Sequence, residues 1–291
     1  MDSVGFIGAG VMGSSMIKNL MKAGFSVGVY TRTRGKADDI VSEGAAWCES
    51  VAACCAGKDA VITIVGFPKD VEEVYFGESG IINSAKDGAY IIDMTTSDPG
   101  LAKRIYDAAN KRGLSALDAP VSGGDAGARN GTLAIMVGGD MPDYEACLPL
   151  FSAMGKTIVY EGPAGSGQHT KMANQIAICG AVSGVCEALC YAKSAGLDVR
   201  TVWETISQGA AGSWQMSNMA PRMLNGDFNP GFYIKHFIKD LRIALQCAGE
   251  NGLDLGITKQ VLSMYEDLEK DGAGDLGTQA LIKHYGGVGQ G

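Results

Sequence analysis

Residues 162–197 read GPAGSGQHTKMANQIAICGAVSGVCEALCYAKSAGL. After a Gly/Pro/Ser turn the stretch runs for about 28 residues without a proline, which predicts a helical rod of about 40 Å. Lys171 and Asn174 are spaced i and i+3 in its first turns, so both side chains leave one face of the helix. Beyond them the helix is apolar nearly all round, which predicts burial. The pattern is typical of a helical strut between two domains, with the candidate functional residues near its start.

The composition is that of an ordinary globular protein. The chain has 291 residues, enough for two domains, with 46% hydrophobic and 19% charged residues. A net charge of −8 argues against nucleic acid or an anionic membrane as the main partner. Met1 leads directly into a strand-like run, so we expect no leader peptide and a cytoplasmic location. The longest uncharged run within 162–197 is too short, and too rich in Gly and Ser, to predict a membrane span.

The eight cysteines do not predict a metal site or a disulfide framework. Cys54 and Cys55 are adjacent, Cys186 and Cys190 are spaced for one helix face, and the three histidines are scattered along the chain. No C-x-x-C motif or Cys/His cluster occurs. We therefore expect reduced, mostly buried thiols and no metal ion.

A glycine-rich turn follows the first apolar run, Ser3–Ile7. A helical pattern comes next and stops at Gly24, and a second strand pattern covers Ser26–Tyr30. Strand, G-x-G-x-x-G, helix and strand is the context that a dinucleotide fingerprint requires, although a glycine turn can also be purely structural. Its glycines would allow a sharp turn, a close approach of backbone N–H groups to a pyrophosphate, and tight helix packing. The predicted cofactor-binding residues here are Gly8, Gly10, Val11, Met12 and Gly13.

The end of the second strand predicts which nicotinamide cofactor is used. An NAD site normally places an acidic residue there for the ribose 2′-hydroxyl, and none occurs before Asp38. Arg32 and Thr33 could instead hold a 2′-phosphate by charge-assisted hydrogen bonds. We expect at least about a tenfold preference for NADP(H), with NAD also possible. The alternative is a solvated arginine cluster on a loop.

Apolar strand patterns at 60–65, 90–94 and 114–119 alternate with helical patterns at 69–75 and 99–112. Such alternation predicts an α/β fold with a Rossmann-type doubly wound parallel sheet and ligands at the carboxyl ends of its strands. Phe67 and Thr95 follow two of these ends and are predicted to contact the cofactor, although an ordinary turn or helix cap fits each equally. Further strands at 132–137 and 157–159 flank a helix at 141–154.

The loop after the strand at 114–119 contains Ser122, Gly123 and Gly124. Two glycines after a serine expose consecutive N–H groups beside a hydroxyl, which suits a substrate carboxylate. By spacing alone, the same residues could form a plain turn.

Strand patterns stop after Leu197. Helical patterns at 199–209, 216–224, 233–251 and 257–270 predict an all-α C-terminal domain, and the tail 286–291 looks disordered. We expect domains at 1–163, 164–195 (the long connecting helix) and 196–291, and a homodimer or homotetramer because the strut is too apolar for a monomer. Trp214 and Phe232 are candidates to line a substrate pocket, with core packing as the alternative.

Four stretches resemble the signatures of the β-hydroxyacid dehydrogenase family. They are GFIGAGVMGSSMIKNL, DAPVSGG, GSGQHTKMANQ and FYIKHFIKDL, in the family's order between residues 4 and 241. The family includes 3-hydroxyisobutyrate dehydrogenase, tartronate semialdehyde reductase and the glyoxylate/succinic semialdehyde reductases. The resemblance implies a Rossmann-type domain, a long connecting helix and an all-helical domain, which agrees with the pattern of the residues.

The resemblance also implies roles for individual residues. Lys171 matches the catalytic lysine as general acid/base, and Asn174 the substrate-orienting amide. The remaining matches are the substrate loop Ser122, Gly123 and Gly124, the second lysine Lys239 near cofactor and substrate, and the cofactor contact Thr95. Arg32 and Thr33 resemble the NADPH-using reductases, although Thr31 is not the Asn common there.

The implied reaction is hydride transfer between NADP(H) and a small carboxylate-bearing semialdehyde or hydroxyacid of the glyoxylate, succinic semialdehyde or 3-hydroxyisobutyrate type. A decarboxylating enzyme of the 6-phosphogluconate type is an alternative, but that branch has His-Asn where this chain has Ala173 and Asn174. A catalytically silent dinucleotide-binding scaffold is a second alternative, against which Lys171 and Asn174 argue.

Overall fold

The computed structural model describes residues 1–288, and the chain forms two compact units, Met1–Lys171 and Met172–Gly291. The three-part division at 163/164 and 195/196 remains a prediction.

The first unit is built on one sheet of strands in the order β3-β2-β1-β4-β5-β6-β8-β7, with β9 paired to β8. The order reverses between β1 and β4, and such a switch point is where doubly wound sheets bind their ligands. The strands are β1 (Ser3–Ile7), β2 (Ser26–Tyr30), β3 (Ala46–Trp47), β4 (Ala60–Thr63), β5 (Tyr90–Asp93), β6 (Ser115–Asp118), β7 (Val121–Ser122), β8 (Leu133–Gly138) and β9 (Gly155–Gly162).

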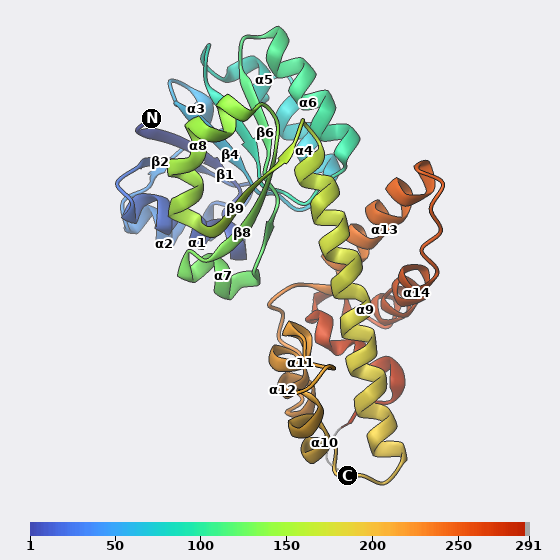
Figure 1. Cartoon of the computed structure of the whole chain (residues 1–291). Helices are drawn as coiled ribbons and strands as arrows, with labels where there is room; N and C mark the ends of the chain where they lie inside the picture. The colour runs from blue at the N-terminus through green and yellow to red at the C-terminus, as the bar shows by residue number, and fades with distance from the viewer. Residues whose placement is uncertain (289–291) are drawn as a thin grey trace. The chain divides into compact units, whose positions relative to one another are not determined.

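Helices cover both faces of this sheet because successive strand residues point to opposite faces. Ile62 and Ile92 belong to the core under α1, α2, α7 and α8, whereas Val61 and Ile91 belong to the core under α3, α4, α5 and α6 (Figure 1). The helices are α1 (Val11–Lys22), α2 (Asp38–Ser42), α3 (Val51–Cys55), α4 (Pro68–Phe76), α5 (Ile81–Ser84), α6 (Pro99–Lys111), α7 (Gly124–Asn130) and α8 (Met141–Met154), with a 3₁₀ turn at Arg34–Lys36. The Rossmann-type prediction is confirmed.

One part of the sheet is not parallel. Strand β8 runs antiparallel to β6 and β7, and β9 then runs parallel to β8. The segment 123–132 between β7 and β8 is shorter than the dozen or more residues that a parallel crossover needs. An apolar run carries no sign of strand direction, so the sequence pattern missed this reversal.

Helix α9 (Ser166–Ser194) is the long helix that residues 162–197 predict. By length and composition α9 could cross a membrane. This differs from the expectation that its uncharged run is too short, and too rich in Gly and Ser, for a membrane span. A core helix of a water-soluble protein passes the same test. In the second unit, Cys179, Val182, Cys186 and Leu189 of α9 are fully or almost fully buried in the apolar core.

The second unit contains no strand among its described residues, as expected. Its helices are the rest of α9, α10 (Val199–Ile206), α11 (Trp214–Asn218), α12 (Ala220–Leu224), α13 (Ile234–Glu250) and α14 (Gly256–Lys270), with 3₁₀ turns at Ala273–Asp275 and Thr278–Tyr285. The single helix predicted at 216–224 is wrong. It breaks at Met219 because Pro221 lacks an N–H and clashes with the preceding turn, so it begins a new helix.

The prediction of a disordered tail is wrong for the part that the structure describes. Gly286 caps the last 3₁₀ turn with φ +85°, the Gly287 carbonyl accepts a hydrogen bond from Lys193 Nζ, and Val288 packs against the core. Residues 289–291 lie outside the described residues.

Candidate active site

The glycine turn after β1 lies at the switch point of the sheet. Gly8 has φ +110°, and a Cβ there would stand 2.1 Å from the Ile64 carbonyl oxygen at the end of β4. A Cβ at Gly13 would stand 1.9 Å from the Gly8 carbonyl oxygen, so α1 packs directly on the turn. Both positions therefore require glycine, as the fingerprint predicts.

Gly10 differs from its two neighbours in the motif. It is the N-cap of α1, and a Cβ there would meet nothing within 4 Å. No side chain caps this helix end, where Val11, Met12 and Gly13 form the first turn. An uncapped helix start beside open space fits the pyrophosphate of a dinucleotide. These residues would hold the phosphates of NAD(P) through backbone N–H groups.

Arg32 follows β2, beside the turn. Its Nη1 lies 3.0 Å from Asp70 Oδ1, and Asp70 Oδ2 accepts the N–H of Phe67. The exposed Arg32 is thus tethered to a buried carboxylate at the start of α4. Thr33 is exposed and precedes the 3₁₀ turn at Arg34–Lys36. This geometry is compatible with a 2′-phosphate site and joins Arg32 to the loop of Phe67.

Thr95, after β5, is almost fully buried. Its Oγ1 accepts the N–H of Val65, and its own N–H donates to Asp93 Oδ1. The hydroxyl therefore ties the ends of β4 and β5 together. Its predicted contact with the cofactor stays a prediction.

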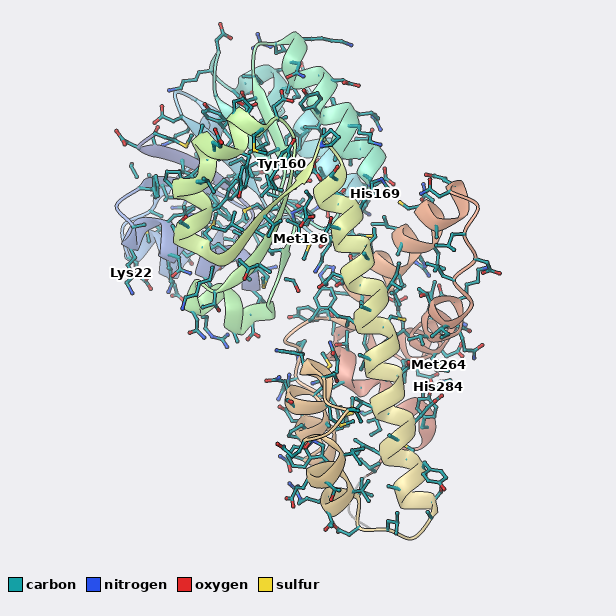
Figure 2. All side chains as sticks on the ribbon, viewed as in Figure 1. Lys22, Met136, Tyr160, His169, Met264 and His284 are labelled. Carbon is teal, nitrogen blue, oxygen red and sulfur yellow. The ribbon has the colours of Figure 1, made fainter. Side chains whose placement is uncertain are left out.

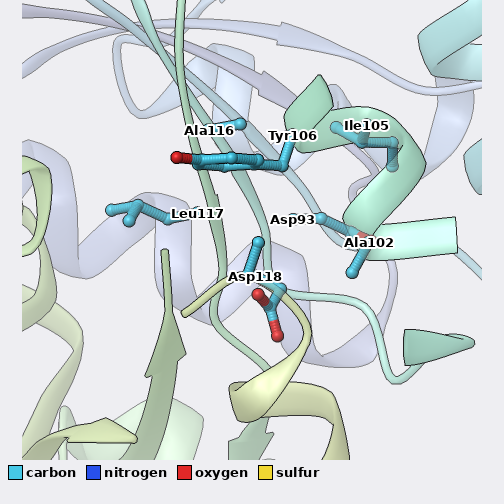
Figure 3. Close-up of a pocket in the computed structure, with 8 residues that line it drawn as sticks. Asp93, Ala102, Ile105, Tyr106, Ala116, Leu117 and Asp118 are labelled. Carbon is cyan, nitrogen blue, oxygen red and sulfur yellow. The ribbon is translucent and has the colours of Figure 1, made fainter. Parts of the chain in front are cut away.

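Lys171 lies in the first turns of α9 and is only 6% exposed. The segment that carries it is fixed to the sheet by Asp118, whose two oxygens accept the N–H groups of Gly165 (2.7 Å) and Gln168 (2.8 Å). Burial raises the pKa of Asp118 to about 6, against the opposing effect of these backbone donors. Figure 3 shows the Asp118 carboxylate directed toward the chain that leads into α9, beside a small pocket that Asp93 also lines.

The predicted carboxylate loop has an unusual backbone. Ser122 ends β7, and Gly123 and Gly124 have φ of +134° and +62° at the start of α7. Glycine adopts such angles without strain, and successive N–H groups in such turns form an anion-binding concavity. The loop therefore suits a carboxylate.

In the second unit, four polar residues form a chain of contacts. Asn174 Nδ2 donates to Gln175 Oε1, and Gln175 Nε2 donates to Asp240 Oδ2 at 2.6 Å. Asp240 is fully buried, and its Oδ1 lies 2.9 Å from Lys239 Nζ, a charge pairing without good hydrogen-bond angles. The structure thus joins the predicted residues Asn174 and Lys239 through Gln175 and Asp240.

The two predicted aromatic residues differ in their surroundings. Trp214 is 59% exposed at the start of α11. The half-buried Phe232 packs against the core of the second unit, with ring contacts to Phe237 and His236. Core packing therefore accounts for at least part of the burial of the Phe232 side chain.

The sequence prediction missed Asp118, Gln168, Gln175 and Asp240 as site residues. All four lie inside the motifs quoted for the family, so the motifs were the available signal. Within residues 1–288, no group of three or more His, Cys, Asp or Glu side chains could hold a metal ion. Figure 2 labels two of the histidines, His169 on α9 and His284 near the C-terminus.

Comparison with known proteins places the chain in a family. Residues 3–162 match the model described as the NAD binding domain of 6-phosphogluconate dehydrogenase, and residues 165–285 match the model described as NAD-binding of NADP-dependent 3-hydroxyisobutyrate dehydrogenase. The chain belongs to the β-hydroxyacid dehydrogenase family. It is therefore an NAD(P)-dependent oxidoreductase acting on CH–OH donors.

Relatives within the β-hydroxyacid dehydrogenase family match over nearly their whole length. The uncharacterized oxidoreductase YkwC of Bacillus subtilis is 56% identical over 97% of this chain and 98% of its own. The 2-hydroxy-3-oxopropionate reductase of Escherichia coli is 39% identical over 96% of both chains. The solved structure of Mycobacterium tuberculosis 3-hydroxyisobutyrate dehydrogenase with L-serine superposes with a TM-score of 0.89 at 28% identity, covering 97% of this chain and 98% of the other.

Proposed function

We propose that the protein reduces a small carboxylate-bearing semialdehyde to the hydroxyacid with NADPH, and that Lys171 is the general acid. The observation that carries the proposal is the burial of Lys171. Lysine is rarely buried to this extent, and Lys171 is 6% exposed on a segment that two hydrogen bonds to Asp118 anchor to the sheet, which supports a positioned amine.

When bound, NADPH would supply the hydride for the carbonyl carbon. Lys171 would donate a proton to the carbonyl oxygen in the same step, giving the hydroxyacid and the oxidised nucleotide, and would accept that proton in the reverse reaction. Proton transfer by a positioned side chain typically contributes about 10²–10⁴-fold to the rate.

Ser122, Gly123 and Gly124 would bind the substrate carboxylate, supported by the two positive φ angles of the glycines. Asn174 would orient the substrate, and Lys239 would contact substrate and cofactor. Substrate contacts of Trp214 and Phe232 are also proposed. The Gln175–Asp240 contacts support Asn174 and Lys239, because each of these side chains is held by a buried partner.

The relatives support the proposed substrate class. One of them is a 2-hydroxy-3-oxopropionate reductase and another is a 3-hydroxyisobutyrate dehydrogenase, and in both named substrates one carbon separates a carboxylate from the aldehyde or alcohol carbon. We favour succinic semialdehyde or glyoxylate, since Arg32 and Thr33 resemble the NADPH-using reductases. We also propose a cytoplasmic location and a homodimer or homotetramer.

A panel of NADPH-oxidation assays tests the proposal. Glyoxylate, succinic semialdehyde, methylmalonate semialdehyde and tartronate semialdehyde are compared at equal concentrations, and we expect turnover with at least one. No turnover on any of the four would refute the proposal and favour a silent scaffold. Release of CO₂ during oxidation of a 3-hydroxyacid would favour the decarboxylating alternative.

A further inference from the structure

The side chain of Gln168 crosslinks two parts of the first unit. It is completely buried, and its two ends bond to the backbone of one loop. Its Oε1 accepts the N–H of Ser97 at 2.9 Å, and its Nε2 donates to the Thr95 carbonyl at 2.7 Å. One carboxamide thus fixes the loop after β5 to the first turn of α9.

The backbone of the same turn is held from the other side. The N–H of Gln168 bonds to Asp118 Oδ2, and the N–H of Gly165 to Asp118 Oδ1. Gly167 lies so close to the sheet that a Cβ there would stand 2.4 Å from the Met136 carbonyl oxygen and 2.6 Å from that of Asp118. The start of α9 therefore has little freedom to shift against the sheet.

Lys171 follows Gln168 by three residues, so both side chains leave neighbouring positions of one helix face. We propose that Gln168 is a positioning residue for Lys171: its carboxamide locks the turn that carries the amine to the Thr95–Ser97 loop. This inference rests on the function proposed above, in which Lys171 donates the proton. A displacement of about 1 Å of a catalytic group can lower the rate by about 10²-fold, so such a lock affects catalysis and not only stability.

The first test measures the position of Lys171 without any substrate. Gln168→Met removes both side-chain hydrogen bonds while nearly conserving volume. Labelling by an amine reagent, trinitrobenzenesulfonate, is followed at Lys171 by mass spectrometry. We expect labelling about tenfold faster than in the wild type, because local opening exposes the amine. An unchanged labelling rate overturns the proposal.

Gln279→Met is the matched control. Gln279 is equally buried, and its Nε2 bonds to the backbone carbonyls of Asp227 and Asn229. Its loss removes a comparable buried amide from the second unit, so the melting temperature should fall without faster labelling of Lys171. Equal acceleration in both variants would mean that general destabilisation explains the effect, and the proposal would be wrong.

The second test uses catalysis, with the best substrate of the aldehyde panel. In single turnovers with enzyme in excess, Gln168→Met should slow NADPH oxidation about tenfold to hundredfold. In a Lys171→Ala background the same change should slow it less than about twofold, because residues that act as a unit are not additive. Equal slowing in both backgrounds shows that Gln168 does not act through Lys171.

Two further results separate the possible failures. Gln168→Leu removes the same two hydrogen bonds with a side chain of similar volume, so it should match Gln168→Met in labelling and rate, and it serves if the methionine variant does not fold. If Lys171→Ala alone turns over like the wild type, the proposed function fails. The labelling test still decides whether Gln168 positions the amine.

Discussion

Asp70 holds Arg32 in place: Arg32 is 73% exposed and Asp70 only 6%, yet Nη1 and Oδ1 are 3.0 Å apart. Asp70 is itself fixed, since its other oxygen accepts the N–H of Phe67. A guanidinium has five donors in a planar fork, so one contact with Asp70 sets its direction and other donors stay available to a phosphate. The pair therefore pre-orients Arg32 after β2.

Arg32→Ala should reduce the preference for NADPH over NADH. A lost charge-assisted hydrogen bond to a 2′-phosphate is worth about 1.5–3 kcal/mol, which corresponds to at least about a tenfold fall in kcat/KM for NADPH. The value for NADH should stay nearly unchanged. Steady-state kinetics with both cofactors measure this, with Arg200→Ala, an exposed arginine bonded to Asn225, as control. A higher kcat/KM for NADH in the wild type would contradict the prediction.

Lys171→Ala should lower kcat by about 10²–10⁴-fold, the usual contribution of a general acid. The affinity for NADPH should change little, because the predicted phosphate contacts come from the turn after β1 and from Arg32. Stopped-flow kinetics and fluorescence titration with NADPH separate the two effects. Lys193→Ala is the control, since Lys193 lies near the other end of the same helix, where its Nζ donates to the Gly287 carbonyl. Near-wild-type turnover of Lys171→Ala would exclude the role.

Much of the fold could be predicted from the sequence because it depends on local chemistry. Gly8 is required locally by its positive φ, and Gly13 by the clash that a Cβ there would make with the Gly8 carbonyl oxygen in the same strand–turn–helix unit. Strand β8 shows the limit of such patterns. Its residues are as apolar as those of a parallel strand, and only the length of its connection to β7 fixes its direction.

The candidate site divides in the same way. Lys171 and Ser122 could be predicted as candidate site residues because each lies in a motif whose residue types suggest a chemical role. Gln168 could not, because its partners Thr95 and Ser97 lie more than 70 residues earlier in the chain. Asp240 follows the same rule, since its partner Gln175 is 65 residues away. Polar residues whose role depends on distant partners need the fold before they can be interpreted.

Asp118 should make stability depend on pH in an unusual direction. Its pKa is raised from 3.8 to about 6 by burial, so the folded state binds the proton more tightly than the unfolded state between these values. Its contribution to the free energy of unfolding therefore increases as the pH falls from above 6 toward 3.8, by about 2–3 kcal/mol in total. Well above pH 6 the buried carboxylate of Asp118 is ionised in the folded state, and the free energy of unfolding is lower by this full amount.

The comparison of wild type with Asp118→Asn isolates this contribution, because other titrating groups act equally in both proteins. Urea unfolding at pH 7.5 and at pH 4.5 gives the difference in free energy of unfolding between the wild type and the variant at each pH. We expect the wild type to gain relative to the variant at the lower pH. Equal differences at both pH values would show that Asp118 does not titrate in this range.

Gly10→Ala and Gly13→Ala should separate cofactor binding from folding. A Cβ at Gly13 would stand 1.9 Å from the Gly8 carbonyl oxygen, so that variant must move α1 off the turn and lose about 1–3 kcal/mol or more of stability. A Cβ at Gly10 meets no protein atom within 4 Å, so its stability should change by less than about 1 kcal/mol. The same methyl group would stand where the pyrophosphate approaches, weakening NADPH binding at least about tenfold. Urea unfolding and fluorescence titration measure the two quantities on the same samples. If Gly10→Ala bound NADPH like the wild type, the space beside Gly10 would not be the phosphate site.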